Sequence, residues 1–465
     1  MISSRLRSVI ANNNPVPPDR IDRAAIFVNP LSRHAWLWFE RIPLTQRVGL
    51  AVPQTLQNPA LCDLVRVPGM RVVLFNQPCP RSREFDYIAQ AIERKQLSGD
   101  GEFTRRCHAY LQSLYGAPRA LLTHSCTAAL EMAAMLSGVE PGDEVIMPSF
   151  TFVSTANAFV LRGAVPVFVD IRPDTLNIDE SKIFEAITPR TRAICVVHYA
   201  GVACQMDVIC RIAQENGLMV IEDAAQAHYA FWHDKPLGGI GQLAALSFHE
   251  TKNVISGEGG ALIVNDSALV ERAEVLWQKG TNRLRFNRGE VDKYTWVDLG
   301  SSFLPSELIA AFLWAQLEDG PVITAHRRRL WDRYTTKLAS AEQDGLLRCP
   351  HPPVEHRHNG HIFYVLVPTP DMRPNLLRRL NAGGVNAISH YVPLHNSPAG
   401  LRYARTSGEL PVTENVASCM VRLPLHPAMD EDDVDYVANV LLDALAKQGR
   451  STTSCQTSQA VNRTS

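Results

Sequence analysis

No charge of one sign dominates this sequence of 465 residues. Lysine and arginine number 46 against 47 aspartates and glutamates, so the formal net charge is −1 at pH 7. Nucleic-acid-binding domains are clearly basic, and charge-driven attachment to a membrane or partner needs a polybasic or polyacidic segment. The balance therefore predicts no nucleic-acid partner and no membrane attachment by charge.

Long apolar runs and cysteine motifs are missing too. No run reaches the roughly 18–20 residues of a membrane-spanning helix, and the start, MISSRLRSVIANNN, lacks the hydrophobic region of a signal peptide. The ten cysteines form no CxxC pair and no zinc-module spacing, and they are too few for a disulfide scaffold. These absences predict a cytoplasmic protein with reduced thiols, no membrane span and no metal site.

The two ends of the chain lack the regular hydrophobic patterns of its middle. Residues 1–70 show no sustained period, and we treat them as an N-terminal extension of unknown structure. Met70 stands directly before the first strand of the middle zone, so a true start at Met70 is the alternative. Residues 447–465 are polar and poor in apolar side chains, which predicts a disordered tail.

Strand and helix patterns alternate through the middle of the chain. Short runs rich in Val, Ile or Ala lie at 119–123, 144–147, 165–169, 193–197, 218–221 and 261–264. Helical patterns lie at 84–94, 101–115, 127–136, 327–339 and 374–382. Such alternation indicates a mainly parallel sheet with helices on both faces. We predict an α/β fold with a large domain over 71–324 and a smaller α/β domain over 325–446, the latter with strands at 361–367 and 387–392.

Three local patterns carry chemistry, although each has an ordinary structural alternative. Small residues around Thr127 join a strand to a helix and could admit a phosphate, but could equally be a simple N-cap. An apolar strand ends at Asp223, with Gln226 just after it, and a solvated strand end is the alternative. Lys252 lies between an apolar strand and a glycine-rich turn, where most lysines are surface groups. In this order, phosphate cradle, acid and lysine are typical of fold-type I pyridoxal-phosphate enzymes.

The sequence resembles the DegT/DnrJ/EryC1/StrS sugar aminotransferase family over nearly all of residues 73–446. The resemblance is strongest to members that make dTDP-4-amino-4,6-dideoxygalactose. Blocks that carry it include FNQP (75–78), SCTAALEMAA (125–134), EDAAQ (222–226), SFHETKN (247–253), GEGGALIVND (257–266), HYVPLH (390–395) and RLPLHPAMD (422–430).

The resemblance implies roles around one cofactor, pyridoxal 5′-phosphate. Lys252 would form the Schiff base and move protons, and Asp223 would pair with the pyridine nitrogen. Gln226 would bond the ring hydroxyl, and Phe152 would stack on the ring, although a core aromatic is the alternative for Phe152. The phosphate would be held by Thr127, Ala128 and Ser247.

The resemblance also implies a homodimer with shared active sites. In the family a block Gly-aromatic-Asn-aromatic-Arg reaches the neighbouring phosphate, and here it reads Gly300-Ser-Ser-Phe-Leu304. Ser302 replaces the asparagine and could still donate a hydrogen bond, whereas the group that holds the donor carboxylate is left unassigned. Candidates for substrate contacts are His249, Arg283 and His395, each with an ordinary structural role as its alternative.

The reaction that the resemblance implies is transamination at C4 of dTDP-4-dehydro-6-deoxy-D-glucose, with L-glutamate as donor. The biological setting would be the assembly of lipopolysaccharide or another surface antigen. Alternatives are a 3-aminotransferase, an enzyme for another nucleotide-linked keto sugar, and a non-catalytic regulator that binds cofactor or sugar. A fourth, the dehydratase subgroup, replaces the Schiff-base lysine by histidine, and Lys252 argues against it.

Overall fold

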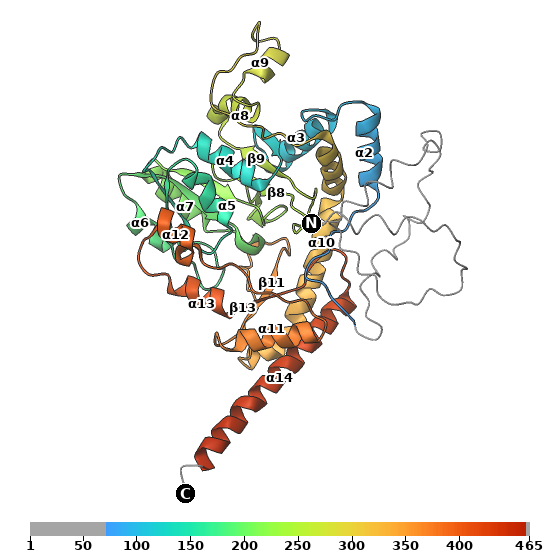
Figure 1. Ribbon diagram of the computed structural model, residues 1–465, viewed down its shortest axis with the longest axis vertical. Coiled ribbons are helices and arrows are strands. Elements are labelled where there is room, and N and C mark those ends of the chain that lie inside the picture. The colour runs from blue at the N-terminus through green and yellow to red at the C-terminus, as the bar shows by residue number, and fades with distance from the viewer. Residues whose placement is uncertain (1–70, 462–465) are drawn as a thin grey trace, which may run out of the picture. The chain divides into compact units, whose positions relative to one another are not determined.

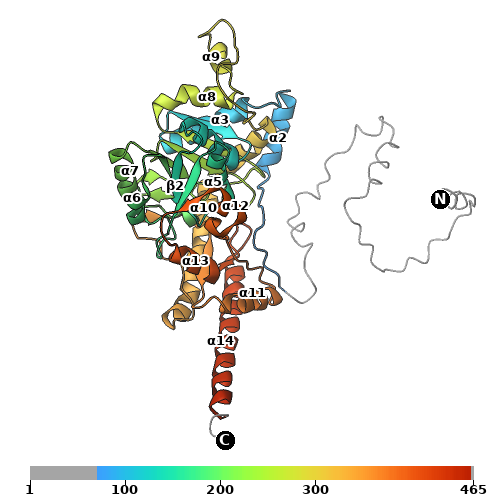
Figure 2. The same cartoon turned by 60° about the vertical axis from the view of Figure 1, so that its left-hand side comes forward.

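The computed structural model describes residues 71–461, with side chains described through Lys447. The predicted extension 1–70 and residues 462–465 lie outside the described residues. The centre of the described fold is an eight-stranded sheet in the order β1-β9-β8-β5-β4-β2-β3-β12 (Figures 1 and 2). Its strands are β1 (Arg119–Thr123), β9 (Gly260–Val264), β8 (Leu243–Ser247), β5 (Met219–Asp223), β4 (Thr191–Val197), β2 (Glu144–Pro148), β3 (Val165–Val169) and β12 (Arg405–Thr406).

The sheet is parallel except for β9, which runs antiparallel to both of its neighbours. Strands β2, β8 and β9 are buried at every position, and so is all but one residue of β1, β3, β4 and β5. Burial on both faces explains why these strands read as continuous apolar runs rather than alternating ones. The predicted mainly parallel sheet is confirmed.

Helices cover both faces of this sheet. On one face α4 (Cys126–Leu136), α5 (Val153–Val160) and α8 (Val270–Trp277) pack on side chains such as Val145, Ile221 and Leu262. On the other face lie α3 (Glu102–Tyr115), α6 (Ile183–Ala186), α7 (Met206–Glu215) and the first half of α10 (Glu307–Gln343). Helix α2 (Arg83–Glu93) packs along α10 (Figure 1).

A second hydrophobic core forms the smaller lobe. It gathers the later half of α10 with β11 (Phe363–Leu366), β13 (Met420–Leu423), α11 (Met372–Ala382), α13 (Pro411–Cys419) and α14 (Glu431–Val461). The predicted domain boundary at residue 325 does not separate the two lobes completely. Helix α10 crosses it without a break, and β12, from the range predicted for the small domain, pairs with β3 of the large sheet. The remaining elements are α9 (Arg283–Asn287), α12 (Pro398–Tyr403), β6 (Phe231–Trp232), β7 (Lys235–Pro236), β10 (His356–Arg357) and four 3₁₀ turns at Glu180–Lys182, Tyr199–Gly201, Ser267–Leu269 and Leu394–Asn396.

Helix α10 passes through Gly320 and Pro321, where a helix would ordinarily break. A proline donates no hydrogen bond to the carbonyl four residues earlier, which here belongs to Leu317. The hydroxyl of Tyr229 donates to that carbonyl instead, at 3.2 Å. A Cβ on Gly320 would lie 2.4 Å from the ring of Tyr229, so glycine permits this approach. One tyrosine thus compensates for the proline and keeps the helix continuous.

The backbone of α14 continues to Val461, so a helix extends through most of the range 447–465 that was predicted to be a disordered tail. The packed part of this helix ends near Leu445, which is buried in the core of the small lobe. Adding residues to an existing helix avoids the cost of nucleation, so a polar stretch can extend it. Among the described residues, no helix is long and apolar enough to cross a membrane.

Candidate active site

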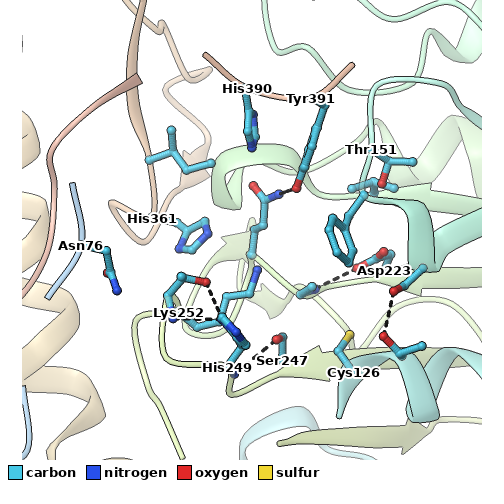
Figure 3. Close-up of a pocket in the computed structure, with 18 of the residues that line it drawn as sticks. Asn76, Cys126, Thr151, Asp223, Ser247, His249, Lys252, His361, His390 and Tyr391 are labelled. Atoms are coloured by element: carbon cyan, nitrogen blue, oxygen red, sulfur yellow. Dashed lines mark hydrogen bonds between the residues drawn. The ribbon is translucent and has the colours of Figure 1, made fainter. Parts of the chain in front are cut away.

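A cavity of about 540 Å³ lies where the parallel strands β4, β5 and β8 end, and the smaller lobe closes its other side (Figure 3). Ligands of open α/β sheets bind at this edge because loops from neighbouring strands converge there. Lys252, Asp223, Gln226, Thr127, Ser247, Phe152 and His249 all line the cavity. The structure therefore brings together most of the residues that the sequence predicted from separate segments.

Lys252 stands on the tight loop between β8 and β9. The loop is closed by backbone hydrogen bonds from Lys252 to His249 (2.9 Å) and from Ser256 to Phe248 (2.7 Å). Burial lowers the pKa of the lysine, which the carboxyl of Asp223 partly offsets. Within residues 71–461 its amine makes no hydrogen bond or ion pair. An amine of lowered pKa without a partner is suited to attack an aldehyde and to exchange protons.

Asp223 is the last residue of β5 and points into the same cavity (Figure 3). Its Oδ2 accepts a hydrogen bond from Thr155 Oγ1 at 2.7 Å, and its Oδ1 accepts one from the backbone of Ala225 at 3.1 Å. Burial raises the pKa of the carboxyl above its ordinary value. A protonated ring nitrogen beside it would supply the missing positive charge and favour the ionised form.

The start of α4 forms the small-residue end of the cavity. Ser125 caps the helix by accepting the backbone N–H of Ala128 at 3.1 Å, and Thr127 shares a hydrogen bond with Ser154 at 2.7 Å. Strand β9 passes directly beneath, since a Cβ on Gly260 would lie 2.5 Å from the backbone nitrogen of Cys126. Hydroxyls at a helix N-terminus fit a phosphate. Ala128 is buried and does not line the cavity, so only its backbone could contribute.

Phe152 and Gln226 line the cavity together with Lys252. Phe152 caps α5 and is 56% exposed, which excludes the alternative that it is a core aromatic. The amide of Gln226 is held at both ends: its oxygen accepts the N–H of Ala200 at 2.7 Å and its nitrogen donates to Tyr391 at 3.0 Å. The ring of Tyr391 stacks on that of His390 with 3.7 Å between the ring centroids, so this wall is fixed by aromatic packing.

Three predicted residues lie away from the cavity. His395 bonds Ser149 at 2.7 Å and Glu414 at 3.3 Å and does not line this cavity, so its contact with substrate stays a prediction. Arg283 and Ser302 line a different, polar hollow near the start of α9. One chain alone therefore does not place Ser302 at its own cavity, and its contact with a neighbouring chain stays a prediction.

Sequence reasoning missed several residues of the cavity wall, above all Arg422 and Tyr391, and assigned no role to His361. All three lie beyond residue 325, in the range predicted for the smaller domain. Arg422 and Tyr391 stand inside the blocks RLPLHPAMD and HYVPLH, which were the available signal, but no local pattern there indicates a ligand.

The wall as a whole fits pyridoxal phosphate. It offers an amine of lowered pKa without a partner, a buried carboxyl, an exposed aromatic ring and hydroxyls at a helix N-terminus. Within residues 71–461 no cluster of side chains is suited to hold a metal ion.

Comparison with known proteins agrees with this geometry. Residues 78–442 match the model of the DegT/DnrJ/EryC1/StrS aminotransferase family. The chain is 33% identical over 377 residues to the Bacillus subtilis spore coat polysaccharide biosynthesis protein SpsC, covering 79% of this chain and 96% of that one. It superposes on the aminotransferase TlmJ of Streptoalloteichus hindustanus with a TM-score of 0.75 and 30% identity, over 81% and 100% of the chains. An aminotransferase of this family from Brucella abortus gives a TM-score of 0.71 and 29% identity, over 78% and 95%.

Proposed function

The chain belongs to the DegT/DnrJ/EryC1/StrS aminotransferase family and is a pyridoxal-phosphate enzyme, and from that premise we propose its reaction. It transfers the amino group of L-glutamate to C4 of dTDP-4-dehydro-6-deoxy-D-glucose. The products are 2-oxoglutarate and dTDP-4-amino-4,6-dideoxy-D-galactose, so the amino group of the donor and the ketone oxygen of the sugar exchange places. The enzyme works in the cytoplasm, in the supply of sugars for surface polysaccharide.

The observation that carries the proposal is the shared cavity of Lys252 and Asp223. Pyridoxal phosphate supplies an aldehyde that carries the nitrogen and a ring that withdraws electrons. Lys252 would hold that aldehyde, and its amine would then move a proton at the α-carbon of the donor and at C4 of the sugar. Asp223 would pair with the protonated ring nitrogen, Phe152 would contact the ring, and Thr127 and Ser247 would hold the phosphate.

The choice of sugar is supported by the sequence blocks quoted above and by the similarity to a polysaccharide biosynthesis protein. The test is an assay of the purified chain with L-glutamate and dTDP-4-dehydro-6-deoxy-D-glucose, with the configuration at C4 of the product read by NMR. A dTDP-3-keto sugar and keto sugars linked to GDP or UDP serve as competing acceptors. Turnover of one of these alone would overturn the proposed substrate, whereas binding of cofactor without turnover of any acceptor would indicate a regulator.

We further propose that the active enzyme is a homodimer in which Ser302 bonds the cofactor phosphate of the neighbouring chain. Two observations support this. Ser302 lies outside the cavity of its own chain, and exposed apolar side chains gather beside it on the segment that includes α9, which projects from the large lobe (Figure 1). Trp296 is 77% exposed and Tyr294 57%.

Mixing two inactive variants tests the shared site. Lys252→Ala removes the lysine, and Ser302→Glu places a negative charge toward the neighbouring phosphate. If sites are shared, a mixed dimer contains one cavity with both residues intact, and the mixture regains activity that neither variant has. No recovery in a mixture shown by mass to contain mixed dimers would overturn the assignment of Ser302.

A further inference from the structure

We infer that Arg422 binds the α-carboxylate of the amino-acid donor. The inference rests on the proposed aminotransferase function and fills the one role that sequence reasoning left unassigned. It starts from the position of Arg422 on β13, the strand of the smaller lobe that faces the cavity.

Arg422 is held by its backbone while its side chain stays unpaired. Its backbone pairs with Tyr364 across the small sheet and exchanges two hydrogen bonds with Ile388, at 2.8 and 3.2 Å. Its guanidinium lies over the ring of Phe75, 4.7 Å from the ring centroid. Among the described residues, its buried Nε has no acceptor and no carboxylate lies within ion-pair distance. A fixed, buried guanidinium without an anion is costly unless a ligand supplies one.

The groups that face Arg422 are cationic or neutral. Burial is the main cause that lowers the pKa of Lys252, Arg327, His361 and His390, and the positive charge of Arg422 is among the smaller causes for each. The hydroxyls of Tyr199 and Tyr391 are its neutral neighbours. The acids that line the cavity are Asp223, assigned to the ring nitrogen, and Glu258, whose carboxylate lies 3.7 Å from His249. This part of the cavity is thus electropositive and is suited to bind an anion.

Arg327 is the second buried arginine of the cavity, and its bonds explain why we assign the carboxylate to Arg422. The Nε and Nη2 of Arg327 donate to the carbonyls of Gly360 (3.1 Å), His361 (2.7 Å) and Leu425 (2.9 Å), so it braces the wall, and only its Nη1 has no acceptor among the described residues. Arg422 has its side-chain donors free for a ligand, and a guanidinium can grip a carboxylate with two parallel hydrogen bonds.

Because Arg422 shares the cavity with Lys252, we assign it to the α-carboxylate of the donor and not to the side-chain carboxylate. The amino group that leaves the donor must lie at the Lys252 amine, and the α-carboxylate is attached to the same carbon atom. Arg422 and Lys252 line the same cavity, so we place the carboxylate of that carbon atom at the Arg422 guanidinium. A residue that binds the α-carboxylate serves every amino-acid donor, whereas a residue that binds the side-chain carboxylate serves glutamate alone.

The experiment compares Arg422→Gln and Arg422→Lys with the wild type and with Arg348→Gln, an exposed arginine beside the same small sheet. The donor half-reaction is followed without sugar, through the absorbance of the bound cofactor, with L-glutamate and with L-alanine. Loss of charged hydrogen bonds should weaken the apparent affinity for both donors about 10- to 100-fold in Arg422→Gln. Arg422→Lys should recover part of it, and Arg348→Gln should match the wild type.

Two further measurements separate binding from other effects. Calorimetry with 2-oxoglutarate should show the same loss of affinity in Arg422→Gln, whereas cofactor affinity and the half-reaction with the amino sugar should not change. Equal donor affinity in Arg422→Gln and wild type would overturn the inference and leave the proposed function intact. A loss confined to glutamate would overturn the α-carboxylate assignment. If Arg422→Gln does not fold, Arg422→Lys with unchanged donor affinity would overturn the inference as well. A wild type that reacts with glutamate but with no keto sugar would instead overturn the proposed function alone.

Discussion

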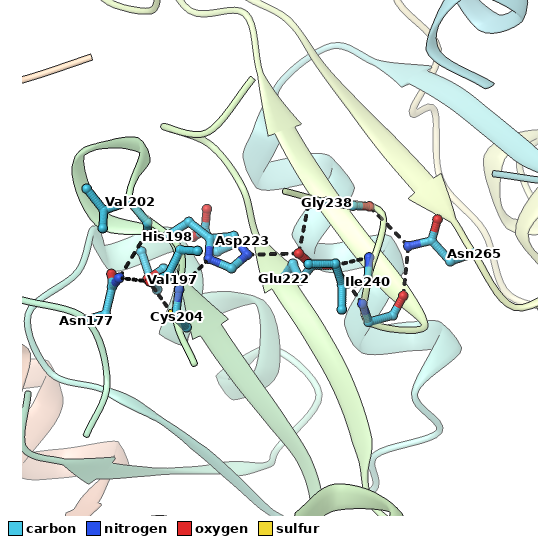
Figure 4. Close-up of polar contacts among 12 residues, drawn as sticks. Asn177, Val197, His198, Val202, Cys204, Glu222, Asp223, Gly238, Ile240 and Asn265 are labelled. Atoms are coloured by element: carbon cyan, nitrogen blue, oxygen red, sulfur yellow. Dashed lines mark hydrogen bonds and ion pairs between the residues drawn. The ribbon is translucent and has the colours of Figure 1, made fainter. Parts of the chain in front are cut away.

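The imidazole of His198 and the carboxylate of Glu222 are hydrogen bonded at 2.8 Å, and both side chains are fully buried behind the cavity (Figure 4). The backbone N–H of Cys204 donates to His198 Nδ1 at 3.2 Å, so the imidazole proton stands on Nε2 and is donated to Glu222. The carboxylate also accepts the backbone N–H groups of Gly238 (2.7 Å), Ile240 (2.8 Å) and Gly241 (2.6 Å).

Four donors thus surround a buried acid that directly precedes Asp223. Burial alone would raise the pKa of Glu222, but the bonds from His198 and the backbone hold it below its ordinary value. The carboxylate ties the end of β5 to the end of β4 and to the loop before β8. We conclude that Glu222 positions Asp223 without touching the cavity itself.

Replacing Glu222 with glutamine should destabilise the fold. The amide nitrogen of glutamine would face N–H donors and leave at least one of them without an acceptor, at a cost of about 2–4 kcal/mol in the free energy of unfolding. Urea unfolding measures this, and Glu215→Gln on the exposed face of α7 is the control. A Glu222→Gln protein as stable as the wild type would show that the buried group is not an ionised carboxylate.

Glu144 on β2 should make stability depend on acid pH. Its carboxylate accepts two hydrogen bonds from Arg405 on β12 (3.0 and 2.8 Å), one from Arg190 (2.6 Å) and one from Thr188 (2.7 Å). Of these, the Arg405 bonds contribute most to lowering the pKa of Glu144 to about 2. A carboxyl whose pKa is lowered by folding stabilises the fold above its unfolded pKa, near 4.5, and loses that contribution as the pH falls toward 2.

Glu144→Gln should therefore remove on the order of 2 kcal/mol of stability at pH 7, less than the full shift implies because the arginines are partly exposed. The difference from wild type should shrink between pH 5 and about 2, where the wild-type carboxylate becomes protonated. Thermal unfolding across this range measures it. Glu271→Gln, in an exposed ion pair with Arg285, should have little effect at any pH. A difference that stays constant with pH would contradict the assignment.

The sequence predicted the sheet well because its strands are buried on both faces. Residues 119–123 and 165–169 were predicted with the bounds that the structure shows, since a doubly buried strand is a continuous apolar run. Helix α10 was predicted only over 327–339, against the observed Glu307–Gln343. The first half could not be predicted from its own residues, because Pro321 is compensated by Tyr229, which lies far away in the sequence.

The same distinction separates the predicted and the missed residues of the site. Asp223 ends a strand, Thr127 lies at the start of a helix shortly after a strand, and Lys252 lies between a strand and a glycine-rich turn, and each of these positions is a local signal. Arg422 sits inside an apolar strand of the smaller lobe, and nothing in its neighbours says that its side chain is unpaired. That property arises from packing between segments distant in sequence, here β13, Phe75 and Tyr391. The bonds of His395 to Ser149 and Glu414 could not be predicted for the same reason, because they join segments that are distant in sequence.

Removal of the Lys252 amine should abolish catalysis while leaving the fold intact. Lys252→Ala should lose the visible absorbance of the cofactor bonded to the lysine, and kcat should fall by about 10²–10⁴-fold or more because no group replaces its proton transfer. Absorbance after addition of pyridoxal phosphate and steady-state rates measure the two effects. Lys235→Ala, an exposed lysine on β7, is the control. An unchanged spectrum in Lys252→Ala would show that another amine binds the cofactor.

Thr155→Val should weaken the pairing between Asp223 and the cofactor without removing either group. Valine has nearly the shape of threonine but cannot donate the 2.7 Å hydrogen bond from Oγ1 to Asp223 Oδ2. That bond lowers the pKa of Asp223 against the effect of burial, so its loss should raise the pKa further. The ionised carboxylate is the form that binds a protonated ring nitrogen, so cofactor affinity should fall about 5- to 10-fold near neutral pH.

The pH dependence distinguishes this effect from a general loosening of the cavity. As the pH falls, cofactor affinity should decline from a higher pH in Thr155→Val than in wild type, because the carboxyl with the raised pKa takes up its proton earlier. Fluorescence titration of the cofactor-free protein with pyridoxal phosphate between pH 5 and 9 measures the shift. Thr151→Val is the matched control, since Thr151 shares a hydrogen bond with Thr155 at 2.8 Å but does not touch Asp223. Parallel displacement of both variants, with the pH of half-maximal affinity unchanged, would show that the threonine acts by packing and not through the charge of Asp223.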